Sequence, residues 1–102
     1  MVTVVYKVQV KEGREEEFRG VALACERVAH ESRGCIYYSF FRSLTNSREF
    51  VVFYRFSSKR AQDSHIKHLQ EVLGSADKGR DLPRKFMDLV ENEDLVLFNV
   101  ED

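Results

Sequence analysis

Three segments of the chain carry large hydrophobic side chains at odd and even positions alike. They are Cys35–Phe41, Phe50–Phe56 and Leu95–Phe98. A strand with one wet face alternates polar and apolar residues, because successive side chains point to opposite faces of the sheet. These segments therefore predict strands that are covered on both faces. Two long helices can cover one face of a four-stranded sheet, so we expect the other face to pack against a second copy of the chain in a homodimer.

The beginning of the chain predicts a strand followed by a helix. Val2–Val10 alternates at the period of a strand, and its even positions form one apolar face. Gly13 breaks this pattern. Three glutamates then occupy the position of a first helical turn, where negative charge is favoured. Apolar residues recur at helical spacing from Phe18 to Ala29, and Gly34 supplies the expected stop.

The middle of the chain predicts a hairpin and a second helix. The aromatic-rich strands Cys35–Arg42 and Glu49–Phe56 are separated by turn-forming polar residues. Ser57 or Ser58 can cap the helix that follows, and Gly74 ends it. The stripe of this helix that we expect to face the sheet consists of Ala61, His65, Leu69 and Val72.

The C-terminal part completes a recognisable order of elements. The polar segment Ser75–Asp81 is expected to be loosely structured, and Asp81–Val90 predicts a short helix with Pro83 in its first turn. Leu95–Val100 closes the chain as a strand. The order strand, helix, strand, strand, helix, strand predicts a ferredoxin-like α+β fold with an antiparallel sheet, in one domain over residues 1–102.

Charge and composition indicate which kind of molecule the protein is expected to bind. The net charge is −1, and lysines and arginines are interspersed with acidic residues, which argues against binding to nucleic acid or to an anionic membrane. A small molecule is the expected partner. Neither a leader pattern nor an apolar stretch of membrane length is visible, so we expect a cytoplasmic protein. Cys25 and Cys35 match no zinc or redox spacing and are expected to be reduced, buried core thiols.

His65 is the main candidate for chemistry. It lies four residues from both Ala61 and Leu69, so the helix should direct it toward the sheet. It is either a core histidine bonded to a backbone carbonyl, or an acid, base or ligand donor in a pocket. His68 lies one turn further on, but zinc needs another ligand and none stands at a recognised spacing, so we predict no metal site. His30 is expected to be solvated.

The aromatic residues allow two interpretations. Most should belong to the core or to the dimer interface, although several tyrosine hydroxyls under one helix could also orient a planar ligand. The glycines are scattered, so the sequence contains neither a phosphate-binding loop nor a nucleophile elbow. We therefore expect no bound cofactor.

The order and spacing of several short motifs resemble those of one family. These are Lys11–Phe18, Glu31–Tyr38 and Phe50–Ser58, followed by Ala61 and His65. Together they resemble the antibiotic biosynthesis monooxygenase family of dimeric α+β barrels. The resemblance implies a homodimer whose two sheets pack into a barrel, with one ligand pocket per chain between the sheet and the helices.

The resemblance also assigns site residues. His65 matches the characteristic histidine of the second helix. Phe56 stands where many members have tryptophan, Tyr54 replaces a frequent glutamate, and Tyr6 stands where haem-degrading members carry asparagine. These differences argue against haem degradation. Family members vary over Ser75–Asp94, which is expected to form a lid or a pocket wall.

The leading functional hypothesis is a cofactor-independent monooxygenase acting on a small aromatic or quinol-like molecule. His65 would be the base, Tyr6 and Tyr54 would hydrogen-bond the substrate oxygens, and Phe56 would pack on the substrate ring. The alternatives are a non-catalytic dimeric small-molecule-binding or stress protein, and a small isomerase of the same fold. A phosphorylated isomerase substrate needs a basic cluster, and only Arg55 lies close to these residues in sequence.

Overall fold

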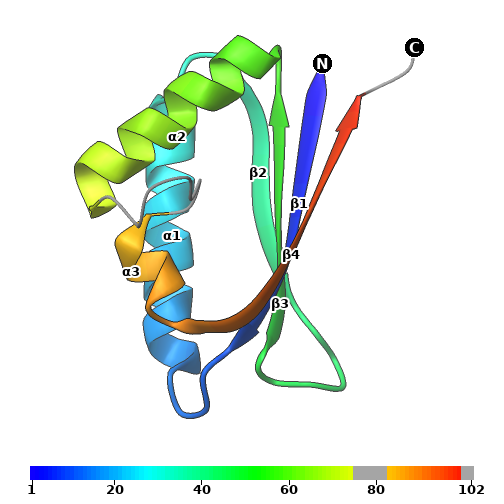
Figure 1. Ribbon diagram of the computed structural model, residues 1–102, viewed down its shortest axis with the longest axis vertical. Coiled ribbons are helices and arrows are strands. Elements are labelled where there is room, and N and C mark those ends of the chain that lie inside the picture. The colour runs from blue at the N-terminus through cyan, green and yellow to red at the C-terminus, as the bar shows by residue number, and fades with distance from the viewer. Residues whose placement is uncertain (75–82, 100–102) are drawn as a thin grey trace.

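The computed structural model describes residues 1–74 and 83–99, and Figure 1 shows helices packed on one side of a sheet. The elements are β1 (Val2–Val10), α1 (Glu15–Glu31), β2 (Cys35–Arg42), β3 (Glu49–Phe56), α2 (Lys59–Leu73), α3 (Arg84–Met87) and β4 (Val90–Asn99). The strands are antiparallel in the order β2-β3-β1-β4. The ferredoxin-like α+β prediction is therefore confirmed. No helix in the described ranges has the length and apolar character needed to cross a membrane.

The core lies between the helices and the sheet, and the even-numbered side chains of the central strands belong to it. At one end, the Phe18 ring contacts Phe50 and Phe86, with ring centroids 4.8 and 5.0 Å apart. At the other end, Tyr54 and Phe56 on β3 lie under α2. Burying apolar surface in this layer supplies the main favourable free energy of folding. Because the helices cover this face of the sheet, the even-numbered residues of β1 and β3 are the ones that can contact α2.

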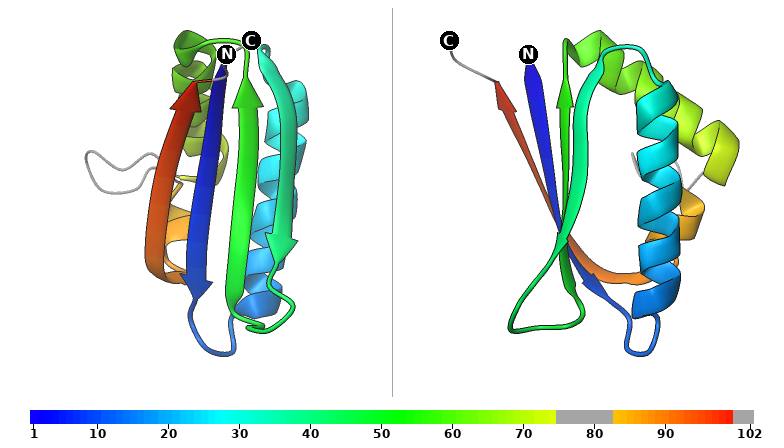
Figure 2. Two further views of the ribbon diagram at one scale, coloured as in Figure 1. Left: turned by 90° about the vertical axis from the view of Figure 1, so that its right-hand side faces the viewer. Right: turned by 180° about the vertical axis from the view of Figure 1, so that it is seen from behind.

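The opposite face of the sheet carries no helix, as the left view of Figure 2 shows. Residues directly opposite each other in an antiparallel pair share a face, so the register assigns the odd-numbered residues of β1 and β3 to this outer face. Its large apolar side chains are Val5, Tyr37, Phe41, Val51, Phe53, Val96 and Phe98. Several of them are markedly exposed, including Phe41 and Phe98 at 53% each. The chain therefore presents an apolar sheet face, as the two-sided pattern predicts.

Several predicted boundaries differ from the structure. β4 begins at Val90 rather than Leu95, because Val90 and the residues after it already pair with β1. α3 is correspondingly shorter than the predicted Asp81–Val90 helix. Val72 is exposed and Leu73 is buried in its place, because the buried face of α2 continues from Leu69 to Leu73.

Two other expectations have different outcomes. Cys25 is buried, whereas Cys35 is half-buried at the start of β2, where the ladder with β3 is irregular. The expectation of loose structure over Ser75–Asp81 lies outside the described residues. The described part of the expected lid, 83–94, lines neither of the two spaces beside His65.

Gly34 positions the start of α2 against the end of α1. It has a φ of +83°, and a Cβ at this position would lie 2.6 Å from the Ala61 Cβ and 2.9 Å from the Ser57 Oγ. Its carbonyl accepts a hydrogen bond from the Ser57 amide at 2.8 Å. Only glycine combines this backbone conformation with such a close approach. Gly34 therefore allows the end of α1 to pack closely against the start of α2.

We expect Gly34→Ala to lower the free energy of unfolding by about 2–4 kcal/mol, from left-handed backbone strain together with overpacking. Urea unfolding measures this loss. Gly20→Ala is the matched control, because Gly20 lies within α1 and a Cβ there meets nothing within 4 Å. The control should be stabilising by roughly 0.5–1 kcal/mol. Equal stability of the two variants would contradict the packing role of Gly34.

Candidate functional site

α2 places His65 against the sheet. The Ser58 hydroxyl accepts a hydrogen bond from the Ala61 amide at 3.1 Å and begins the helix, which then directs His65 inward. The side chain is 2% exposed. Its ring centroid lies 5.2 Å from that of Tyr54 and 5.3 Å from that of Phe56. The histidine thus sits in an aromatic environment, as its spacing predicts.

A serine at the end of α1 holds the imidazole. The Ser32 hydroxyl donates to the Val28 carbonyl at 2.8 Å and lies 2.9 Å from the His65 Nδ1. Because the only hydroxyl hydrogen is directed at the carbonyl, we infer that Ser32 Oγ accepts a hydrogen bond from Nδ1–H. The other ring nitrogen, Nε2, then carries the lone pair. It is buried and has no hydrogen-bond partner among the described residues.

The same burial keeps the imidazole uncharged. Desolvation lowers the pKa of His65 to about 4, and the nearby His68 acts in the same direction. At pH 7 the ring is therefore neutral, and its Nε2 is available to accept a proton. The sequence left open whether His65 bonds a backbone carbonyl or faces a pocket, and in the structure its partner is a serine hydroxyl.

The lowered pKa of His65 predicts a pH-dependent stability. The unfolded chain takes up a proton near the ordinary value of 6.5, whereas the folded chain does so only near 4. The contribution of the neutral buried ring is thus complete above pH 6.5 and is lost as the pH falls through 4. In urea unfolding, wild type should lose on the order of 3 kcal/mol more than His65→Asn between pH 7 and pH 3.5. Parallel pH profiles of the two proteins would contradict the lowered pKa.

Four residues singled out from the sequence meet at one internal cavity. Tyr6, Tyr54, Phe56 and His65 all line it. Val4, Ile66, Leu69 and Gln62 complete the wall. The cavity has a volume of about 10 Å³, which is room for about one water molecule. The structure therefore brings all four predicted residues together, around a space that is too small for a substrate in this conformation.

Gln62 is a residue of this cavity that the sequence interpretation missed. Its Oε1 is buried and has no hydrogen-bond partner among the described residues, like the His65 Nε2. A helix places residues three apart on one face, so its spacing from His65 was the available signal. A buried polar atom without a partner costs free energy, and a bound water or ligand would remove that cost. Two such atoms line the same cavity.

Burial keeps the cavity tyrosine protonated. It raises the pKa of Tyr54 well above its ordinary value, and the Tyr54 hydroxyl lies in hydrogen-bonding contact with the Cys25 thiol. Burial also raises the pKa of Cys25 to about 12, so the thiol is neutral. A thiol is a weak hydrogen-bond partner. The Tyr54 hydroxyl can therefore exchange this contact for a stronger acceptor.

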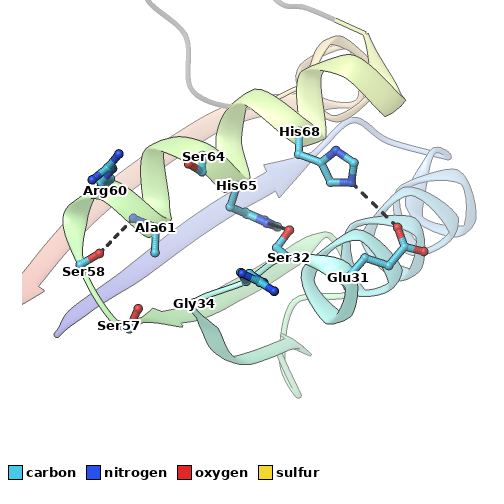
Figure 3. Close-up of a pocket in the computed structure, with 11 residues that line it drawn as sticks. Glu31, Ser32, Gly34, Ser57, Ser58, Arg60, Ala61, Ser64, His65 and His68 are labelled. Carbon is cyan, nitrogen blue, oxygen red and sulfur yellow. Dashed lines mark hydrogen bonds and ion pairs between the residues drawn. The ribbon is translucent and has the colours of Figure 1, made fainter.

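An open cleft adjoins the cavity, with His65 lining both. Figure 3 shows the His65 ring projecting from α2 toward Ser32 among the residues of this cleft. The cleft has a volume of about 530 Å³. It is lined by Glu31, Ser32, Arg33, Gly34, Ser57, Ser58, Arg60, Ala61, Ser64, His65 and His68. The end of α1 and the start of α2 form it together, so it depends on tertiary structure that no local motif encodes.

The other histidines have separate environments. His68 lies 3.9 Å from a Glu31 carboxylate oxygen and 3.8 Å from one of Glu71, whereas His65 bonds Ser32. Within the part of the chain that the structure describes, no three His, Cys, Asp or Glu side chains form a group that could hold a metal ion. His30 is exposed at the end of α1, as expected.

Comparisons with known proteins agree with this architecture. A structure from Methanosarcina mazei Go1, described as a conserved protein, has a TM-score of 0.80 at 18% identity and covers 98% of this chain and 92% of its own. The structure of a Mycobacterium tuberculosis protein has a TM-score of 0.79 at 18% identity and covers 99% of this chain and 95% of its own. SnoaB, a cofactor-independent oxygenase from Streptomyces nogalater, has a TM-score of 0.80 at 15% identity and covers 99% of this chain and 93% of its own.

These identities establish the common fold alone. No curated protein sequence matches the chain significantly. The sequence model of the family described as antibiotic biosynthesis monooxygenase matches residues 1–71, which include β1 to β3, most of α2 and all four predicted site residues. The resemblance seen in the sequence is thereby confirmed, and the chain belongs to the antibiotic biosynthesis monooxygenase family.

Proposed function

We propose that the protein is a cofactor-independent monooxygenase that acts on a small aromatic or quinol-like substrate, with His65 as the catalytic base. The observation that carries this proposal is the buried Nε2 of a neutral histidine, unpaired among the described residues and surrounded by aromatic rings. A base of this kind can take a proton from a substrate hydroxyl or an activated C–H group. The family membership and the fold shared with SnoaB support the same class of reaction.

The proposed reaction needs no other reductant. Nε2 removes a proton from the substrate, and the electron-rich phenolate or carbanion reduces molecular oxygen. For a substrate methylene group, one oxygen atom enters the product as a carbonyl, and the two hydrogens leave with the other oxygen as water. The substrate supplies all four electrons. A dry, apolar site protects such an intermediate from protonation by solvent.

The remaining cavity residues have distinct proposed roles. Tyr6 and Tyr54 would donate hydrogen bonds to substrate oxygens, and Phe56 would pack on the ring. The cavity as it stands holds about one water molecule, whereas small-molecule sites usually have volumes of about 300–1,000 Å³. We therefore propose that α2 moves away from the sheet when substrate binds, which joins the cavity to the cleft beside His65.

We also propose that the outer sheet face forms a homodimer interface. Besides its apolar side chains, this face carries opposite charges at its two ends. Arg55, whose Nε is buried without a partner among the described residues, lies at one end. Glu49 and Asp94 lie at the other end together with Lys7, which is 3.5 Å from Glu49, so that end has a net negative charge. A two-fold axis that lies between the two sheets, parallel to them and perpendicular to their strands, would place each Arg55 over the acidic end of the second copy. The same surface can thus pair with itself.

The experiment that tests the proposed activity is an oxygen-uptake screen of the purified protein against hydroquinones and anthrones. An absorption spectrum taken first excludes carried-over haem or flavin. We expect uptake that depends on the protein and that stops at one oxygen molecule per anthrone oxidised to the anthraquinone. Saturable substrate binding without oxygen uptake would contradict the oxygenase and favour the non-catalytic binding protein. Proton exchange or isomerisation without uptake would favour the isomerase.

A further inference from the structure

The open cleft beside His65 has more positive than negative charge. Two arginines line it, Arg33 in the segment after α1 and Arg60 on α2. Both side chains are exposed, and neither has an ion pair or a hydrogen bond in the described structure. Glu31 is the one carboxylate in the lining, and it lies beside His68 at 3.9 Å. An unpaired guanidinium presents donors that match the oxygens of a carboxylate or a phosphate.

Backbone and hydroxyl donors border the same space. α2 begins at the cleft, and Ser58 already accepts from the Ala61 amide, which leaves the amides of Lys59 and Arg60 without an acceptor within the helix. The hydroxyls of Ser57 and Ser64 also line the cleft, and Gly34 keeps the wall open where a Cβ would contact Ser57 and Ala61. Arginines and amide donors in one cleft favour an anion.

The cleft leads to a buried polar group that still needs a ligand. His65 is 2% exposed and lines the cleft, and its Nε2 has no partner among the described residues. Figure 3 shows the ring lying between α2 and Ser32. A molecule bound in the cleft can therefore reach the imidazole once the adjoining cavity opens. This places an anion site and a base next to each other.

We propose that this cleft binds an oxyanion group, a carboxylate or a phosphate, on the small aromatic substrate, with Arg33 and Arg60 as its charged ligands. The inference rests on the proposed function for the aromatic part of the substrate. The sequence showed only Arg55 close to the site residues and therefore no basic cluster for an anionic substrate. In the structure Arg55 lies on the outer face of the sheet, and the basic pair at the site comes from α2 and the segment after α1.

Binding of three matched probes tests the proposal without any need for turnover. We would titrate the ¹⁵N-labelled protein with benzoate, phenyl phosphate and the neutral benzyl alcohol, following the amides of residues 57–61. We expect saturable shifts with at least one anion, and an affinity for benzyl alcohol at least about tenfold weaker. The anion that binds more tightly identifies the preferred group. Equal binding of all three probes, or no saturation with either anion up to roughly 10 mM, would overturn the proposal.

Charge variants locate the binding site. The double variant Arg33→Gln and Arg60→Gln should weaken anion binding at least about tenfold, since each guanidinium supplies charge-assisted hydrogen bonds. Lys59→Gln is the control for the Arg60 part of this change: it removes one positive charge beside Arg60, but Lys59 is paired with Asp63 at 2.6 Å and does not line the cleft. An equal loss in the control would show only a general effect of charge and would overturn the assignment.

The outcome is independent of the oxygenase reaction. Arginine-dependent anion binding without oxygen uptake on any substrate would support the anion site and contradict the proposed activity. Oxygen uptake that is unchanged in the double variant, with neutral and carboxylated substrates turned over equally well, would support the activity and overturn the anion site. The two proposals can therefore fail separately.

Discussion

Replacing His65 with asparagine should reduce turnover of any accepted substrate by about 10²–10⁴-fold, the usual contribution of a general base. Asparagine can keep a donor near the position of Nδ1 and so retain the bond to Ser32, but it has no counterpart of Nε2. The loss should appear in kcat, measured as initial oxygen uptake at saturating substrate. Turnover of His65→Asn within about threefold of wild type would remove His65 as the base.

The control for this variant must separate chemistry from stability. His65→Ala is less informative, because His65 is buried and its truncation should cost about 2–4 kcal/mol of stability through a void and an unpaired Ser32. His30→Asn is the matched control, since His30 is exposed on α1 and lines neither the cavity nor the cleft. It should keep wild-type turnover. Circular dichroism at the assay temperature checks that His65→Asn remains folded.

Phe53→Asp should convert the proposed homodimer into a monomer. Phe53 lies near the middle of the outer face, opposite Val5 on β1 and in edge contact with Tyr37 at 5.6 Å. A carboxylate at the centre of an apolar interface is desolvated without a partner, so the dissociation constant should rise at least about a hundredfold. Sedimentation over a concentration series measures this change.

Leu44→Asp is the control for the dimer test. Leu44 is fully exposed in the turn between β2 and β3, away from the residues of the outer face, so the same substitution there should leave the association unchanged. A wild-type protein that sediments as a monomer at micromolar concentration would contradict the proposed interface. So would a Phe53→Asp protein that remains dimeric.

Local patterns predicted most of the fold. The β1 alternation, the aromatic hairpin and the inward position of His65 follow from side-chain periodicity alone, and the structure agrees with each. Errors occurred at element ends. Val72 and Leu73 are adjacent hydrophobes near the end of α2, and only the helix packing decides which is buried. The start of β4 at Val90 depends likewise on pairing with β1.

The site was predicted only in part, because much of it depends on contacts distant in sequence. Tyr6, Tyr54, Phe56 and His65 were named through the family resemblance, and they share one cavity. Ser32 could not be foreseen, since it lies 33 residues from its partner His65. The cleft formed by Arg33 and Arg60 likewise arises where two helix ends meet. Such a juxtaposition has no periodic signal in the sequence.

The central claim is that Ser32 holds His65 as a neutral imidazole with Nε2 free to act as a base. Long-range ¹H–¹⁵N NMR of the ring nitrogens tests this most directly, because it identifies which nitrogen carries the proton and needs no substrate. The account predicts a protonated Nδ1 and an unprotonated Nε2 at pH 7, with protonation of the ring only as the pH approaches about 4. A proton on Nε2 at pH 7, in either the neutral tautomer or the imidazolium, would contradict it.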